Sequence, residues 1–150
     1  MNNTIRVTKI FHFEMAHALD GHDGLCQHIH GHSYVLEVCL IGKPDPNPQS
    51  PKQGMVMDFA DLKGIINRLI ISRFDHALVV RQDSNTHHLQ ANNPNARIVA
   101  VPFQPTCENM LPYFASLLAH KLPHGVALHH LRLHETASAF AEWYASDNDH

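Results

Sequence analysis

Apolar and polar residues alternate along the start of the chain, and this pattern restricts the fold more than any other feature of the sequence. Residues 5–14 carry isoleucine, valine and phenylalanine at alternate positions, with Lys9 as the one polar interruption of the apolar set. A period of two residues is typical of a strand with one face buried. A second run, residues 32–41 (HSYVLEVCLI), is more continuously apolar, which indicates a strand buried on both sides.

Turn residues and helical spacing predict the other elements. Residues 42–54 hold four prolines and two glycines, so they form a loop. The predicted strands are 54–59, 97–103, 126–135 and 140–144. Asp58 is a candidate N-cap for a helix over residues 59–70, and Thr106 for a second helix that ends at Gly125, with a kink or a late start at Pro112. We therefore predict a single α+β domain over residues 1–150, with a mainly antiparallel sheet and the two longer helices on one face of it.

Composition narrows the function classes. A chain of 150 residues can bury about 68–70% of its unfolded surface, and 44% hydrophobic with 17% charged residues is typical of a globular protein. The net charge of −3 provides no broad basic surface, so we expect neither nucleic acid nor a membrane as a partner. The 15 histidines stand out from an average composition.

The cysteines and the start of the chain point to a compartment. Residues 1–10 (MNNTIRVTKI) lack the charged and apolar regions of a secretory signal, and no apolar run approaches about 18 residues. We expect a cytoplasmic protein with three reduced thiols: Cys26, Cys39 and Cys107. Cys39 lies within an apolar run and is predicted to be a small core residue.

Residues 26–34 (CQHIHGHSY) place a cysteine and three histidines within seven positions. On a strand, His30 and His32 point to the same face, and His17 becomes a third ligand if the first two strands pair. Three histidines with an open fourth position are typical of catalytic zinc. Spacing alone leaves a polar, histidine-rich loop as an equal alternative. The pair His129-His130 is adjacent in sequence, a poor geometry for sharing one ion.

The other candidates carry two interpretations each. Cys26 is either a fourth ligand that closes a structural zinc site or a free thiol, activated by a nearby cation, that acts as base or nucleophile. Adjacent residues of a strand point apart, so Asp75-His76 is more simply a turn after the helix. Glu135 is more simply an exposed strand end. Glu108 is more simply an acid that stabilises the first turn of its helix.

The order of six short segments makes chance an inadequate explanation. They are FHFEMAHAL, CQHIHGHSY, GMVMDFADLK, FDHALVV, PTCEN and LHET. In this order they resemble the signature segments of the 6-pyruvoyltetrahydropterin and 6-carboxytetrahydropterin synthase family, from about Phe11 to Tyr144. The resemblance implies the tunnelling fold, in which subunits associate so that their sheets form a barrel. It also implies a homo-oligomer, with a hexamer suggested by the family, and sites at subunit interfaces.

The resemblance implies a role for each matched residue. Zn²⁺ would be held by three ligands: His17, His30 and His32. Cys26 would be the general base, with Asp75 and His76 as the relay that activates it, and the resemblance implies that the thiol and the relay can come from different subunits. Glu135 would anchor the pterin ring, and the substrate pocket would be lined by Thr106 and Glu108.

The family substrate is 7,8-dihydroneopterin triphosphate. We favour a zinc-dependent lyase that forms 6-carboxy-5,6,7,8-tetrahydropterin and releases acetaldehyde and triphosphate, a step of queuosine or deazapurine biosynthesis. Formation of 6-pyruvoyltetrahydropterin from the same substrate is the second interpretation. A protein that binds zinc or pterin without catalysis is the third.

Overall fold

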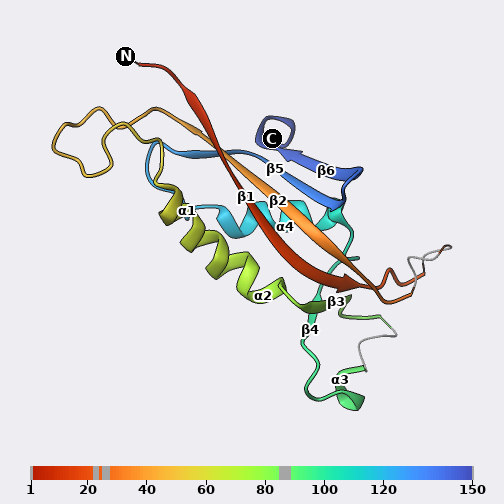
Figure 1. The fold of residues 1–150 in the computed structure, drawn as a ribbon. Coiled ribbons are helices and arrows are strands. Elements are labelled where there is room, and N and C mark those ends of the chain that lie inside the picture. Colours follow the sequence, from red (N-terminus) through yellow and green to blue (C-terminus); the bar gives the residue numbers. More distant parts are fainter. Residues whose placement is uncertain (1, 22–23, 25–27, 85–88, 150) are drawn as a thin grey trace.

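The computed structural model describes residues 2–21, 24, 28–84 and 89–149. Within them, six strands form one sheet with the order β4-β3-β1-β2-β5-β6 (Figure 1). The strands are β1 (Ile5–His17), β2 (His30–Gly42), β3 (Ala77–Arg81), β4 (Ile98–Val101), β5 (Ala127–Thr136) and β6 (Ala139–Tyr144). The helices are α1 (Phe59–Ile66), α2 (Ser72–Phe74), α3 (Leu89–Asn92) and α4 (Cys107–Leu118). A π-helical turn, Asn67–Ile71, connects α1 to α2.

Two long antiparallel strands form the centre of the sheet. β1 and β2 have 13 residues each and stay in register from the pair Ile5–Gly42 to the pair His17–His30. β5 adds to β2 and β6 to β5, both antiparallel, whereas β3 and β4 join on the other side of β1 in parallel. The predicted α+β class with a mainly antiparallel sheet is confirmed, and the parallel strands are confined to one edge.

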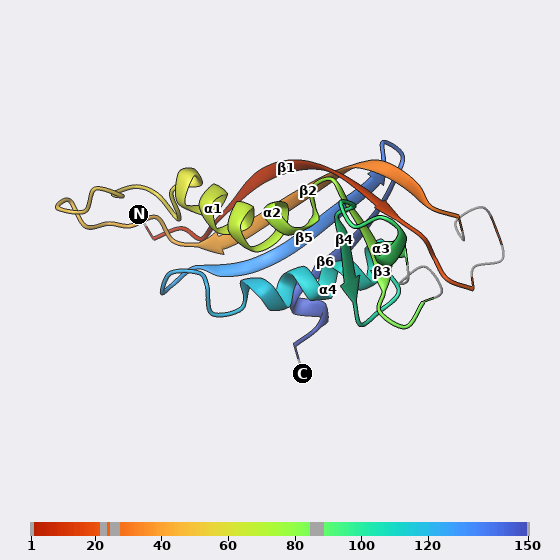
Figure 2. The same cartoon turned by 90° about the horizontal axis from the view of Figure 1, so that it is seen from below.

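One face of the sheet is buried under the helices. Phe11, Phe13 and Met15 of β1 are buried, while the residues between them, His12 and Glu14, are exposed. The same hydrophobic cluster contains apolar residues of α1, α2 and α4, so these helical segments cover the same face, as Figure 2 shows. This agrees with the prediction of two longer helical segments on one face. The opposite face carries the polar half of the alternation and is called the open face below.

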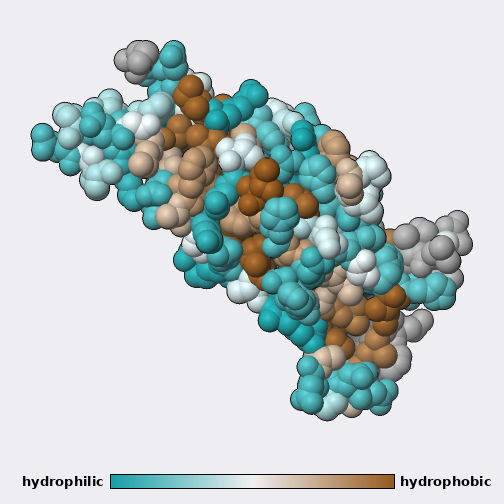
Figure 3. All heavy atoms as spheres, viewed as in Figure 1, coloured by the Kyte–Doolittle hydropathy of each residue, from teal (hydrophilic) through white to brown (hydrophobic). Residues whose placement is uncertain are grey.

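The surface combines polar regions with separate apolar areas. In the view of Figure 3 most of the surface is hydrophilic, with hydrophobic areas between. The exposed large apolar side chains of the described residues are Ile5, Ile10, Ile29, Met55, Phe59 and Phe140. None of the helices in the described part of the chain combines the length and the apolar character that a membrane span requires.

The predicted strand at residues 54–59 is wrong. The segment closes the preceding loop, because the amide of Asp45 donates to the carbonyl of Met55 and the amide of Gly54 donates to the carbonyl of Asp45. Asp58 then caps α1 by accepting a hydrogen bond from the amide of Ala60. Met57 is buried, so the apolar residues of this segment fill the core without forming a ladder.

The second predicted helix has the expected start but an earlier end. Thr106 caps α4 through its hydroxyl, which accepts from the amide of Asn109, and Pro112 lies inside the helix rather than at a late start. The helix ends at Leu118, because the backbone of Ala119 turns to ψ 130° and His120 then adopts a left-handed conformation with φ 63°. Gly125, the predicted end, lies in the turn before β5.

Candidate metal centre

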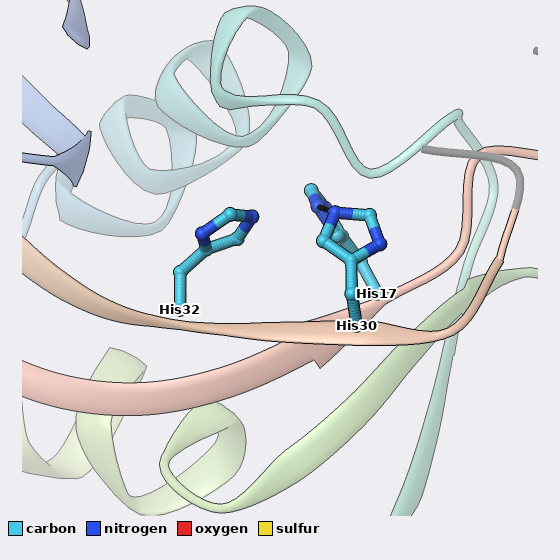
Figure 4. A group of neighbouring side chains, drawn as sticks. All are labelled: His17, His30 and His32. Carbon is cyan, nitrogen blue, oxygen red and sulfur yellow. Dashed lines mark hydrogen bonds between the residues drawn. The ribbon is translucent and has the colours of Figure 1, made fainter. Parts of the chain in front are cut away.

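Three histidines gather on the helix-covered face where β1 ends and β2 begins. His17 lies directly opposite His30 in the antiparallel register, and His32 lies two residues further along β2, opposite Met15. Directly opposed residues share a face, as do residues two apart in one strand. One ring nitrogen from each histidine lies within 4.8 Å of the others, and Figure 4 shows the three rings side by side. The structure therefore brings together the three residues predicted as ligands.

Backbone carbonyls fix the tautomer of two of these rings. Nδ1 of His17 lies 2.8 Å from the carbonyl oxygen of Pro105, and Nδ1 of His30 lies 2.7 Å from that of His28. A carbonyl oxygen can only accept, so each Nδ1 carries the proton and each Nε2 presents its lone pair. The two Nε2 atoms are nevertheless only 2.9 Å apart. Two lone pairs facing each other at this distance repel unless a proton or a metal cation lies between them, so these residues fit a metal ion.

His32 and Glu135 complete the group. Nε2 of His32 is buried and makes no hydrogen bond with the described residues. Oε1 of Glu135 lies 3.4 Å from this nitrogen and 3.3 Å from Nε2 of His17. Burial lowers the pKa of His17, which favours the neutral ring that a metal requires. Three imidazoles with a carboxylate beside them fit zinc chemistry.

Asp75 and His76 form a joined pair at the start of β3. His76 has φ 62°, a left-handed conformation that is costly for a residue with a side chain. This turn lets the adjacent side chains meet, so Nδ1 of His76 lies 2.9 Å from Oδ1 of Asp75. Glu14 holds the turn through its backbone, donating to Asp75 and accepting from the amide of His76. The expectation that the two side chains point apart is therefore wrong.

The remaining predicted site residues are Cys26, Thr106 and Glu108. Cys26 lies outside the described residues. Thr106 uses its hydroxyl to cap α4, and it follows Pro105, whose carbonyl holds His17. Glu108 is exposed in the first turn of α4, where a carboxylate stabilises the positive end of the helix.

Two pockets meet at His32. One is lined by Glu14 and His76, on the β3 side, and the other by Glu135 and Thr136, on the β5 side. His32 lies in the wall of both. The second pocket is therefore lined by one of the three histidines and by Glu135.

Comparison with known proteins places this geometry in a family. A family model described as 6-pyruvoyl tetrahydropterin synthase matches residues 6–146. The chain belongs to this family. A 6-carboxy-5,6,7,8-tetrahydropterin synthase of Haemophilus influenzae is 36% identical over 141 residues, covering 92% of this chain and 97% of the relative. The enzyme of the same name from Rickettsia felis is 32% identical and covers 92% and 99%.

Two solved structures share the fold. An uncharacterised protein from Wolinella succinogenes superposes with a TM-score of 0.78 at 21% identity, covering 95% of this chain and 99% of that one. The 6-pyruvoyl tetrahydropterin synthase of Caenorhabditis elegans gives 0.67 at 22% identity, covering 95% and 96%. The predicted family and fold class are thereby confirmed.

Three further residues around the metal centre were not predicted. Tyr34 continues the even-numbered series of His30 and His32, and its hydroxyl lies 3.4 Å from Nδ1 of His17. Burial, followed by the carboxylate of Glu135, raises the pKa of the Cys107 thiol to about 12. The third is Pro105, which acts through its carbonyl. The period of two could have found Tyr34, but no sequence signal marks the other two.

Proposed function

We propose that the protein is a zinc-dependent lyase that converts 7,8-dihydroneopterin triphosphate to 6-carboxy-5,6,7,8-tetrahydropterin, with release of acetaldehyde and triphosphate. The observation that carries this proposal is the convergence of the Nε2 atoms of His17 and His30 on one point, next to a pocket. The names of the two bacterial relatives, which match over nearly their whole length, support the 6-carboxy product. This reaction would be a step of queuosine or deazapurine biosynthesis.

His17, His30 and His32 would hold the zinc. When bound, zinc supplies a Lewis acid that stabilises negative charge on a substrate oxygen beside it. The chain prepares this site before any ion arrives, because the carbonyls of Pro105 and His28 fix two rings with their free nitrogens facing inward. Such outer contacts orient ligands and increase their basicity.

Cys26 would remove a proton from the substrate side chain. Cys26 lies four residues before the proposed ligand His30 in the sequence. A cation near a thiol favours the thiolate form. Asp75 would hold His76 with Nδ1 protonated, which leaves Nε2 available to exchange a proton. The side chain of His76 is 76% exposed, so its ring can reach a group that lies outside this subunit.

Glu135 would bind the pterin. A carboxylate can accept two hydrogen bonds from the amino group and ring N–H of a guanidine-like edge. Glu135 lines the same pocket as His32, which would place the ring of a bound pterin beside the metal. Thr106 and Glu108 stay predictions as pocket residues: the hydroxyl of Thr106 caps a helix, and the carboxylate of Glu108 is exposed.

A homo-oligomer is part of the proposal. Both pockets at His32 lie at the surface of one chain, and the relay histidine is exposed. Separate apolar areas on the same surface, including Ile10 and Phe140, would be covered by association. A second copy of the chain is the partner that would complete each site.

The second candidate is formation of 6-pyruvoyltetrahydropterin, which the description of the matching family favours. It uses the same substrate and the same predicted residues. The two reactions differ in the carbon fragment that is lost, so product analysis separates them.

The test is anaerobic incubation of the zinc-loaded protein with 7,8-dihydroneopterin triphosphate, followed by mass spectrometry and trapping of acetaldehyde. Acetaldehyde with 6-carboxytetrahydropterin is expected. A pyruvoyl product without acetaldehyde would assign the second reaction, and unreacted substrate would contradict both. The matched variant is Cys26→Ala, which is expected to keep zinc and lose turnover. If this variant loses its zinc, the thiol is a ligand and not the base.

A further inference from the structure

A second group of soft ligands lies on the open face of the sheet. It consists of Cys39 from β2 with His129 and His130 from β5, and one ligand atom from each lies within 4.8 Å of the others. It is separate from the first site. Cys39 and His32 lie seven residues apart on β2, an odd number, so their side chains point to opposite faces of the sheet. Seven residues of strand also separate them by about 23 Å.

A β-bulge makes this grouping possible. Cys39 pairs with His130, but the next residue of β2, Leu40, pairs with Leu128, so His129 is an extra residue on β5. A bulge re-aims a side chain that regular alternation would send to the other face. The adjacent histidines therefore meet, with their Nδ1 atoms 2.7 Å apart. The expectation that adjacent histidines have a poor geometry for sharing one ion is therefore wrong at this position.

The imidazoles are held in place by an aromatic neighbour. Tyr144, which pairs with His130 across β5 and β6, stacks on that ring with centroids 4.7 Å apart. The edge of the His129 ring also contacts Tyr144, at 5.7 Å. A ligand whose ring is fixed by packing loses little entropy when it binds a metal.

Cys39 is unusual for a buried cysteine. It is 1% exposed, as a small core residue would be, yet it points to the open face and is not among the residues of the main hydrophobic cluster. Its thiol makes a weak contact, 3.8 Å from the carbonyl oxygen of Leu40. The thiol thus lies beneath two imidazoles rather than under a helix.

The nearby charges leave room for a cation. Arg132, the next outward-facing residue of β5, has two carboxylate partners: Glu37 at 3.5 Å and Glu142 at 3.4 Å. Its positive charge is therefore largely balanced. His129 and His130 are half-buried, so an ion from solvent can reach the site across the open face.

We propose that Cys39, His129 and His130 form a second metal site for a zinc-class cation. One thiolate and two imidazoles suit a cation that accepts both sulfur and nitrogen ligands, and the remaining position is open to solvent. The bound cation links β2 to β5 at the bulge and stabilises the register there. This inference does not depend on the proposed catalytic function.

Cobalt and zinc are the probes for this site. In the full chain carrying Cys26→Ala, which removes the thiol near the first site, we expect two Co²⁺ per chain after dialysis and a thiolate-to-cobalt charge-transfer band in the near ultraviolet. Adding Cys39→Val removes the band and one equivalent of metal. The matched control, Cys107→Ala, keeps both, because that thiol lies on the helix-covered side.

A second variant guards against misfolding of the first. The double substitution of His129 and His130 by alanine changes half-buried side chains and is expected to lose one equivalent of zinc while the first site retains its own. Turnover should persist in Cys39→Val made in the native background. The proposal is overturned if the Cys26→Ala protein binds one Co²⁺ without the band. It is equally overturned if both the cysteine variant and the double-histidine variant retain two metal ions per chain.

Discussion

His17 connects the core to the metal centre at the scale of a single residue. Its side chain is 1% exposed, and its ring is held by the carbonyl of Pro105 on one side while its free nitrogen faces His30 on the other. The second ring nitrogen of this buried histidine would be satisfied by a metal ion held between the two rings. We therefore expect the stability of the protein to be coupled to metal binding at this residue.

The substitution His17→Ala tests that coupling. We expect zinc affinity to fall at least about 100-fold, because an outer contact alone is typically worth 10–100-fold. The free energy of unfolding of the metal-free protein should also fall by about 1–3 kcal/mol, because the carbonyl of Pro105 loses its hydrogen-bond donor. Competition with a chromophoric chelator and thermal unfolding measure the two effects. The control is His12→Ala, an exposed histidine of the same strand, which should change neither. Equal zinc binding by both variants would contradict the assignment.

Asp75 performs two tasks with one oxygen atom. Its Oδ1 accepts from the amide of Glu14 and lies 2.9 Å from Nδ1 of His76. In Asp75→Asn an amide oxygen can keep both contacts, but it carries no charge to stabilise a protonated imidazole. We expect turnover to fall about 100-fold or more with zinc content and thermal stability unchanged. Asp75→Ala should in addition lower the unfolding temperature. Full turnover by Asp75→Asn would show that the pair has only a structural role.

At the scale of elements, the sequence predicts what is set by local periodicity. β1, β2 and the helix that starts at Phe59 were predictable because apolar residues repeat at the period of each element. The pairing of His17 with His30 followed from joining the first two strands. The meeting of Asp75 with His76 depends on one left-handed residue, and the meeting of His129 with His130 depends on a bulge. Periodicity carries no information on either irregularity.

Gly42 ends β2 against another part of the backbone. A Cβ at this position would lie 2.9 Å from the carbonyl oxygen of Gly125 and 3.1 Å from Cγ1 of Val56. Because a backbone oxygen cannot move aside cheaply, Gly42→Ala should destabilise the protein by about 1–3 kcal/mol. The matched change is Gly64→Ala in the exposed part of α1, where no described atom outside the helix's own backbone and the neighbouring residues lies within 4 Å of the new methyl group. It should stabilise by about 0.5–1 kcal/mol.

Thermal unfolding of both variants at one protein concentration measures the difference. The transitions should move in opposite directions from the native protein. A similar gain in both variants would mean that the ends of β2 and β5 separate easily, and that the approach of Gly42 to Gly125 is not a constraint on the fold.

At the scale of the whole molecule, the predicted residues of the site fall into two groups. The three histidines and Glu135 lie together in one subunit, whereas the exposed ring of His76 opens into a different pocket from the one lined by Glu135. In a symmetric oligomer, a pocket at an interface contacts an equivalent surface of the neighbouring copy in every subunit. In the proposed homo-oligomer, sequence patterns within one chain could therefore identify the candidate residues but not which copy of the chain would provide each of them.

Mixing two inactive variants tests this arrangement. If the thiol of one subunit works with the relay of another, Cys26→Ala and His76→Ala subunits that are refolded together will form some sites with both native residues. Random assembly predicts recovery of about a quarter of the native activity. Cys26→Ala mixed with His30→Ala is the control, because these residues lie four apart on one segment and must serve the same site. A site shared between subunits predicts that activity returns in the first mixture and not in the control. Recovery of activity in both mixtures, or in neither, would contradict it.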